Sequence, residues 1–169
     1  MTAATLLIDD YEAFGTGAKL IASANDLELD VSTSFVDGLA LFLVGAHDLV
    51  VCDYNLGGEV PGSVDDDDPA ELGLELLARA KVLNPGSRLV LISGALTDDF
   101  LELAGKSSFI DETWPKDQHL DERLLAAMQD AHDRSTTVTD WPAVADAHLN
   151  AKVDKAEVGR IDQALRATL

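Results

Sequence analysis

The chain is poor in cysteine, in basic residues and in long apolar runs, and each shortage excludes a class of protein. Its 169 residues include one cysteine, Cys52, so no internal disulfide can form and a reducing cytoplasm is expected. Twelve Lys and Arg against 31 Asp and Glu give a formal charge of −19, which argues against nucleic acid and anionic membrane as direct partners. No apolar run approaches the roughly 18–20 residues of a membrane span. We therefore expect a cytoplasmic protein that binds neither nucleic acid nor membrane.

Three kinds of functional site also lack their sequence signals. The histidines show no metal-ligand spacing, which argues against a zinc site. No GxGxxG follows the first apolar run, which argues against dinucleotide binding. Hydrolases of the haloacid dehalogenase type expect Asp-x-Asp after that run, whereas Asp9 and Asp10 are adjacent.

Short apolar runs alternate with helical stripes through the first 133 residues, which predicts an α/β domain. The expected strands are 5–9, 27–32, 48–52, 88–92 and about 107–111. The expected helices are 11–25, 35–45, about 70–83, about 98–104 and about 118–133, with Ser34 as a cap of the second. Right-handed crossovers between such units give a doubly wound parallel sheet with helices on both faces.

Two segments fall outside this alternation. Residues 57–71 form an acidic loop insertion, with Gly57-Gly58, Pro61-Gly62 and four aspartates at 65–68. After a domain at 1–134 and a polar linker at 135–141, residues 142–169 form an amphipathic helical extension. This extension is too short for a full DNA-binding domain. It either packs on the domain or mediates a homodimer.

Three carboxylates follow two of the predicted buried strands. Asp9 and Asp10 end the run at 5–8, and Asp53 ends the run at 49–52. The carboxyl ends of parallel strands share one edge of the sheet, where ligands bind in open α/β folds. Carboxylates there would repel one another unless a cation lay between them. The pattern predicts a Mg²⁺ site beside a nucleophilic aspartate, although an aspartate at a strand end can also be an ordinary helix cap.

Three motifs in the right order resemble the receiver domain of two-component response regulators. They are Ile8-Asp9-Asp10-Tyr11, Cys52-Asp53-Tyr54-Asn55-Leu56 and Ile92-Ser93-Gly94-Ala95, and the resemblance covers residues 4–133. It implies a flavodoxin-like fold with a five-stranded parallel sheet in the order 2-1-3-4-5. It also implies a signalling domain rather than an enzyme, with at most Mg²⁺-dependent self-phosphorylation and dephosphorylation on an aspartate.

The resemblance assigns a role to each residue of these motifs. Asp53 would accept the phosphoryl group from a histidine kinase or a phosphotransfer protein, and a downstream protein would read the result. Asp9, Asp10, Asp53 and the backbone carbonyl of Asn55 would hold Mg²⁺. Ser93 would donate a hydrogen bond to a phosphoryl oxygen, and Ser93 and Phe109 would be the switch residues. Cys52, which points away from Asp53 in the pleat, is expected to be a small core residue.

The chain departs from the receiver pattern after the fifth expected strand, where receivers carry a lysine that pairs with the phosphoryl group. Counting from Phe109, that position falls on Glu112, and Lys116 lies four residues later. In one reading a bulge or loop lets Lys116 reach the acidic cluster as a displaced phosphate-pairing lysine. In the other no lysine reaches it, and the chain is a pseudo-receiver, a protein-interaction module that phosphorylation does not switch.

Overall fold

Strands and helices alternate through the part of the chain that the structure describes. The structure is a computed structural model, and it describes residues 4–45, 47–56, 69–94, 96–134, 156 and 159. The strands are β1 (Thr5–Ile8), β2 (Leu29–Ser32), β3 (Leu49–Asp53), β4 (Arg88–Ser93) and β5 (Glu112–Pro115). The helices are α1 (Glu12–Ala24), α2 (Phe35–Gly45), α3 (Pro69–Leu83), α4 (Asp98–Ala104) and α5 (Leu120–Arg134).

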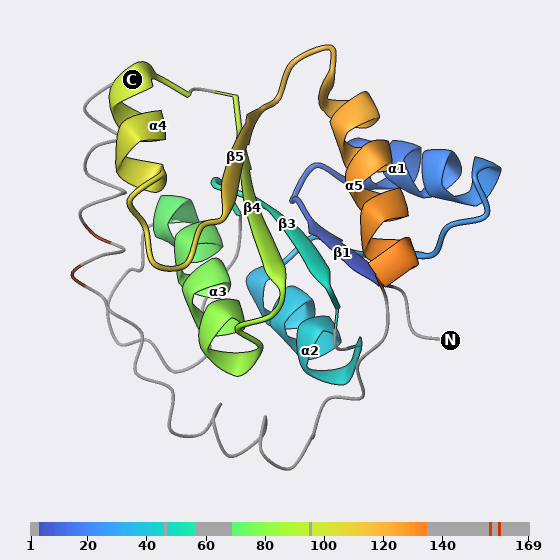
Figure 1. Ribbon diagram of the computed structural model, residues 1–169, viewed down its shortest axis with the longest axis horizontal. Helices are drawn as coiled ribbons and strands as arrows, with labels where there is room; N and C mark the ends of the chain where they lie inside the picture. The colour runs from blue at the N-terminus through green and yellow to red at the C-terminus, as the bar shows by residue number, and fades with distance from the viewer. Residues whose placement is uncertain are drawn as a thin grey trace.

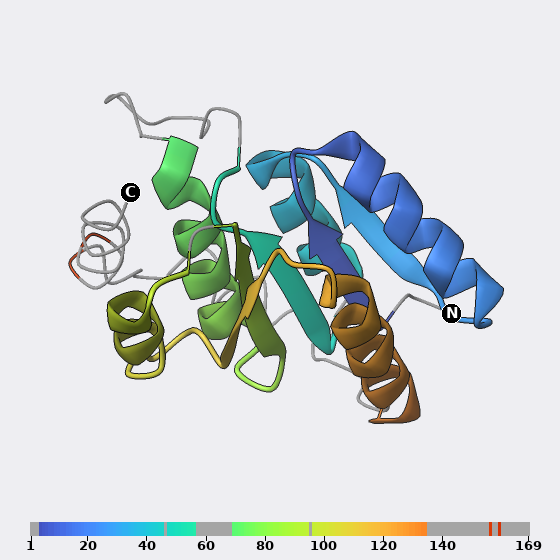
Figure 2. The ribbon, with the colours of Figure 1, turned by 90° about the horizontal axis from the view of Figure 1, so that it is seen from above.

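The five strands form one parallel sheet in the order β2-β1-β3-β4-β5. Helices α1 and α5 cover one face, and α2, α3 and α4 cover the other (Figures 1 and 2). This is the flavodoxin-like, doubly wound arrangement predicted from the sequence. It is confirmed, and it brings the carboxyl ends of β1, β3 and β4 side by side at one edge.

Alternating side chains of the inner strands build two separate cores. In β1, Leu6 and Ile8 pack with α2, α3 and α4, whereas Leu7 packs with α1 and α5. In β3, Cys52 is fully buried on the side of α2 and α3, which confirms it as a core residue. Continuous apolar strands of this kind are buried on both faces. They hold the sheet rigidly and fix where the residues at its edge lie.

The helix ends have identifiable local causes. The Ser34 hydroxyl accepts a hydrogen bond from the backbone N–H of Asp37 at 3.2 Å, so Ser34 caps α2 as predicted. Helix α3 lies so close to β3 that a Cβ on Gly73 would overlap the carbonyl oxygen of Asp53 and come within 2.8 Å of that of Tyr54. The glycine is required there because the obstructing atoms belong to the backbone.

The predicted position of the fifth strand was wrong. The sequence indicated about 107–111, but β5 spans Glu112–Pro115. The apolar pair Phe109-Ile110 suggested a strand, yet both residues lie in the connection from α4 and pack into the core of α2, α3 and α4. Asp111 ends this connection, where its carboxylate accepts the backbone N–H of Leu89 at 2.8 Å. A short apolar run reports burial and does not by itself distinguish a strand from a packed loop.

Part of the sequence-based division lies outside the described residues. This holds for 57–68 of the acidic insertion, for the linker 135–141, and for the C-terminal extension 142–169 apart from two residues. Those two, Ala156 and Gly159, are helical. None of the described helices combines the length and the apolar character needed to cross a bilayer.

Candidate functional site

Asp9 is the first residue after β1 and is held from both sides. Its backbone N–H donates to the carbonyl of Ser32 at 3.0 Å, and its Oδ1 accepts the backbone N–H of Tyr11 at 2.9 Å. Its side chain is fully buried. Helix α1 begins at Glu12 with Tyr11 as its N-cap residue, so the neighbouring Asp10 is exposed and is not that cap.

Asp53 completes an acidic cluster with these two residues. It is the last residue of β3 and is 5% exposed. Asp9, Asp10 and Asp53 each offer a carboxylate oxygen, and the three oxygens lie within 4.8 Å of one another. The structure therefore brings together the three side chains that the sequence predicted to converge.

Lys116 lies directly over this cluster. Its ammonium nitrogen is 2.7 Å from Oδ2 of Asp53 and 2.8 Å from Oδ2 of Asp9. The backbone N–H of Lys116 donates to the carbonyl of Ser93 at 2.9 Å, so it continues the ladder between β4 and β5. Lys116 thus reaches the acidic cluster, as one of the two readings of the sequence expected, and its role as a phosphate-pairing lysine stays a prediction. Lys116 needs no bulge to reach the cluster, because β5 spans Glu112–Pro115 and not about 107–111.

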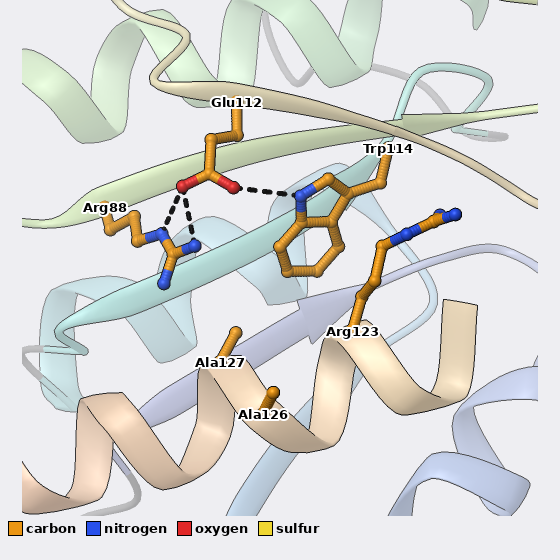
Figure 3. Close-up of a pocket in the computed structure, with 6 residues that line it drawn as sticks. All are labelled: Arg88, Glu112, Trp114, Arg123, Ala126 and Ala127. Carbon is orange, nitrogen blue, oxygen red and sulfur yellow. Dashed lines mark hydrogen bonds and ion pairs between the residues drawn. The ribbon is translucent and has the colours of Figure 1, made fainter. Parts of the chain in front are cut away.

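Glu112 does not occupy the place of the lysine, and the count from Phe109 was wrong on this point. It is the first residue of β5, and its carboxylate pairs with Arg88 at 2.6 Å and accepts from the Trp114 indole at 3.0 Å. Figure 3 shows this group in a shallow pocket between β5 and α5. The negative charge of Glu112 is thus neutralised by Arg88 and is not added to the acidic cluster.

Burial and neighbouring charge set the proton affinity of the cluster. Burial, together with the negative charge of Asp9, raises the pKa of Asp53 to about 6, even though Lys116 and a hydrogen bond from the Asn55 backbone act to lower it. Burial acts to lower the pKa of Lys116, but its contacts with Asp53 and Asp9 outweigh this and raise it. The effect of burial on the pKa of Asp53 therefore outweighs that of its contact with the Lys116 ammonium.

The other residues predicted to belong to the site are Ser93, Asn55 and Phe109. Ser93 is the last residue of β4, is 5% exposed, and is joined to Lys116 through its backbone. Asn55 is exposed and follows Asp53 by two residues. Phe109 is buried in the connection before β5, seven residues ahead of Lys116, and its role as a switch stays a prediction.

Sequence reasoning missed one residue that positions the site, Gly73. Its contact with the backbone of Asp53 and Tyr54 places the start of α3 against the loop that follows β3. A glycine near the start of a predicted helix is a signal for such a close approach, but it does not reveal which backbone lies opposite.

The donor set fits a divalent cation with a preference for oxygen. Mg²⁺ binds through a few carboxylates and retains water or phosphate oxygens on its other positions. Asp9 and Asp53 are buried, and Asp10 faces solvent, so an ion held between them would remain open on one side. Burial is the main reason why the pKa of Asp53 is raised, and the negative charge of Asp9 adds to it, so a bound cation would favour the ionised form of Asp53.

Solved structures similar to this chain include receiver domains of response regulators. The receiver domain of NtrX from Brucella abortus is 24% identical, with a TM-score of 0.58 over 78% of this chain and 99% of that one. A CheY-like receiver domain protein from Methanospirillum hungatei is 19% identical, with a TM-score of 0.59 over 80% and 100% of the two chains. The chemotaxis protein CheY4 of Vibrio cholerae is 14% identical, with a TM-score of 0.60 over 78% and 99%.

These likenesses define the class of the fold, and this chain has the receiver-domain fold. No family model matches the sequence, and no curated protein matches it either.

Proposed function

We propose that the chain is a phosphoryl-accepting receiver domain that takes a phosphoryl group on Asp53. The observation that best supports this proposal is the contact of the Lys116 ammonium with both Asp53 and Asp9 at the carboxyl edge of a receiver-type sheet. A phosphoryl transition state needs positioning and charge neutralisation more than covalent chemistry. The site supplies a nucleophilic oxygen, a fixed cation and a set of carboxylates that suits a metal ion.

In this proposal a carboxylate oxygen of Asp53 attacks the phosphorus of a phosphohistidine. The bond from phosphorus to the imidazole nitrogen breaks, its electron pair stays on the imidazole, and that ring takes up a proton from solvent. Lys116 pairs with a phosphoryl oxygen, and the Ser93 hydroxyl donates to another. Mg²⁺, held by Asp9, Asp10, Asp53 and the Asn55 carbonyl, supplies neutralising charge when bound.

The proposed donor is a histidine kinase or a phosphotransfer protein, and the proposed output is a contact with a downstream protein. Both follow from the fold shared with receiver domains and from a formal charge of −19, which disfavours nucleic acid as the direct target. A cytoplasmic location belongs to the same proposal.

The test is to incubate the protein with Mg²⁺ and acetyl phosphate and to follow its intact mass. We expect one phosphate to be added to the native protein and none to Asp53→Asn. The matched control is Asp48→Asn, which removes a carboxylate just before the opposite end of β3 and should leave the adduct unchanged. An adduct that survives Asp53→Asn, or none on the native protein, would contradict the proposal.

The alternative is a pseudo-receiver that binds a partner without phosphorylation. The placement of Glu112 no longer supports it, because that residue pairs with Arg88. The low identity to solved receivers, 11–24%, keeps it as a second candidate. Titration with beryllofluoride and Mg²⁺ separates the two, because a switched receiver should show two-state changes in amide NMR signals around Ser93 and a pseudo-receiver should not.

A further inference from the structure

Helix α2 exposes apolar side chains on the side that faces away from the sheet. Gly38 marks the side that faces the sheet, since a Cβ there would come within 2.9 Å of the Ile8 side chain. At about 100° per residue, Val36 and Ala40 lie roughly 160° around the helix axis from Gly38, and Val44 lies roughly 120° from it. Val36 is 42% exposed, Val44 is 75% exposed, and Ala40 between them is exposed too. We call Val36, Ala40 and Val44 the outer face of α2.

This face lacks the polar stripe that a surface helix normally shows to water. Helix α2 packs on β1 and β2 and beside α3 (Figure 1), and Asp37 is the single charged side chain among its 11 residues. Helix α5, with 15 residues, holds six Asp, Glu and Arg side chains. The half-buried Leu43, one turn after Ala40, widens the apolar surface. An exposed apolar stripe of this kind is typical of a surface that binds another protein.

The two ends of the outer face carry negative charge. Asp37 lies in the first turn of α2 and is exposed. At the other end the His47 ring lies against Gly45, and its Nε2 is 2.9 Å from Oδ2 of Asp30, whose side chain is 41% exposed. The last turn of α2 holds no basic residue, and the carbonyl groups at the end of a helix add partial negative charge. Both ends therefore attract cations.

The neighbouring parts of the chain do not offset this charge. Residues 20–78, which include β2, α2 and β3, hold thirteen Asp and Glu and no Lys or Arg. On the adjacent α3, Arg79 pairs with Glu75 and Lys81 pairs with Asp111. A second copy of the chain would bring a second formal charge of −19 to this surface, whereas a basic partner would be attracted to it. Charge therefore favours a basic partner over a homodimer.

We infer that the outer face of α2 is a docking surface for an amphipathic helix of another protein, with an apolar stripe flanked by Lys or Arg. The eight-residue step from Val36 to Val44 makes the face about 12 Å long, or roughly two helical turns. Apolar side chains at helical spacing on the partner bury this stripe, and its basic side chains meet the acidic ends. The inference goes beyond the proposed function, since none of these contacts involves a phosphoryl group on Asp53.

The test measures the binding of labelled model peptides to the full-length protein, without Mg²⁺ or a phosphoryl donor. One peptide has about 18 residues of leucine and lysine, with the leucines on one face of a helix. The other carries glutamate in place of every lysine. In fluorescence anisotropy we expect the lysine peptide to bind at least about tenfold more tightly than the glutamate peptide. No binding of the lysine peptide, or equal binding of both, would overturn the inference.

A matched pair of double variants separates the outer face of α2 from the overall charge of the chain. Val36→Ser/Val44→Ser removes its two larger apolar side chains. Leu20→Ser/Leu101→Ser removes two leucines of α1 and α4 that are 68% and 40% exposed. The first should weaken binding of the lysine peptide about tenfold, because less apolar area is buried, and the second should leave it unchanged. Equal affinities of the two variants would mean binding by charge alone and would contradict the inference.

A second matched pair tests the acidic end of the face. Asp37→Lys and Asp121→Lys each reverse one charge in the first turn of a helix, α2 and α5 respectively. Only the first should weaken binding of the lysine peptide, by about threefold, and an equal loss in both would count against the surface. A native dimer in light scattering that Val36→Ser/Val44→Ser dissociates would show instead that a second copy occupies it. None of these outcomes depends on phosphorylation of Asp53.

Discussion

The two edges of the sheet each hold a buried group that can ionise, and their charge balance differs. At the carboxyl edge, Asp9, Asp10 and Asp53 face the single ammonium of Lys116. At the amino edge, the fully buried His47 pairs one to one with Asp30 through Nε2 at 2.9 Å. Burial raises the pKa of Asp53 to about 6 and lowers the pKa of His47. Both shifts have burial as their largest cause. At the carboxyl edge one ammonium faces three carboxylates, whereas at the amino edge a His47 ring that is mostly uncharged at neutral pH hydrogen-bonds a single carboxylate.

The acidic cluster at the carboxyl edge is suited to bind a ligand, whereas the contact of His47 with Asp30 at the amino edge stabilises the fold. The His47 ring stacks on Phe42, and its backbone carbonyl accepts the Ser87 hydroxyl at 2.7 Å, so it links α2 to β3 and β4. Nε2 of His47 is paired with Asp30, whereas its buried Nδ1 has no hydrogen-bond partner among the described residues. The acidic cluster has more carboxylates than ammonium groups, so a bound divalent cation would stabilise it.

The largest expected effect on the free energy of unfolding comes from replacing the closely packed glycine at each edge of the sheet, Gly73 or Gly45, by alanine. A Cβ at Gly73 would meet the backbone carbonyls of Asp53 and Tyr54, whereas one at Gly45 would meet the His47 ring, with Nε2 at 2.6 Å. The backbone carbonyls next to Gly73 cannot move away from an added Cβ as easily as the His47 side chain can. Gly73→Ala should therefore lower the free energy of unfolding by about 3 kcal/mol, and Gly45→Ala by somewhat less. Urea unfolding measures both. A tolerated Gly73→Ala would show that α3 does not press on β3.

Addition of Mg²⁺ should stabilise the carboxyl edge alone. An ion that binds only the folded state adds about 2.7 kcal/mol at 100 times its Kd, seen as a rise in Tm. Asp10→Asn should shrink this gain, because it removes the exposed carboxylate of the cluster. Asp48→Asn, just outside the opposite end of β3, should not. Equal gains in both variants would place the ion elsewhere.

Removal of one carboxylate from each edge should change stability in opposite directions. The pKa of Asp53 lies above its ordinary value of 3.8, so its ionisation costs the folded state stability once the pH rises through about 6. Without divalent ions at pH 8, Asp53→Ala should raise the free energy of unfolding by about 1–2 kcal/mol. Asp30→Ala should lower it by about 1–2 kcal/mol, because it strands a buried His47 N–H. If Asp53→Ala and Asp30→Ala changed the free energy of unfolding in the same direction, the proposed difference between the two edges would be wrong.

The smallest expected effect is the change in the free energy of unfolding with pH that is due to His47 at the amino edge. The pKa of His47 is lowered by burial, against the opposing influence of Asp30 and Asp48, so the unfolded chain takes up its proton first. Stability should therefore fall as the pH drops below about 6.5, by at most about 1.4 kcal/mol per pH unit from this group. His47→Gln should flatten this slope in urea unfolding at several pH values. An unchanged slope would mean that His47 ionises equally in both states.

The inner part of the fold could be read from the sequence because its signals are local and repeated. The apolar runs of β1, β3 and β4 alternate with helical stripes, which favours buried strands, and each run is followed by a residue of the site. The helices between them carried their own stripes and breakers. The outer strand β5 was misplaced because the apolar pair Phe109-Ile110 is buried as a loop, and an edge strand of four residues has little pattern of its own.

The sequence by itself determined the order of strands and helices and the convergence of Asp9, Asp10 and Asp53, because chain direction alone sends parallel strand ends to one edge. Only the tertiary structure decided that Lys116 and not Glu112 meets the acidic cluster, because the hydrogen bond from Lys116 to Ser93 sets how β5 lies beside β4. It also decided that Gly73 touches the backbone of Asp53, since such contacts depend on how one element lies on another. The periodicity of apolar residues along the chain does not show how β5 lies beside β4 or how α3 lies on β3.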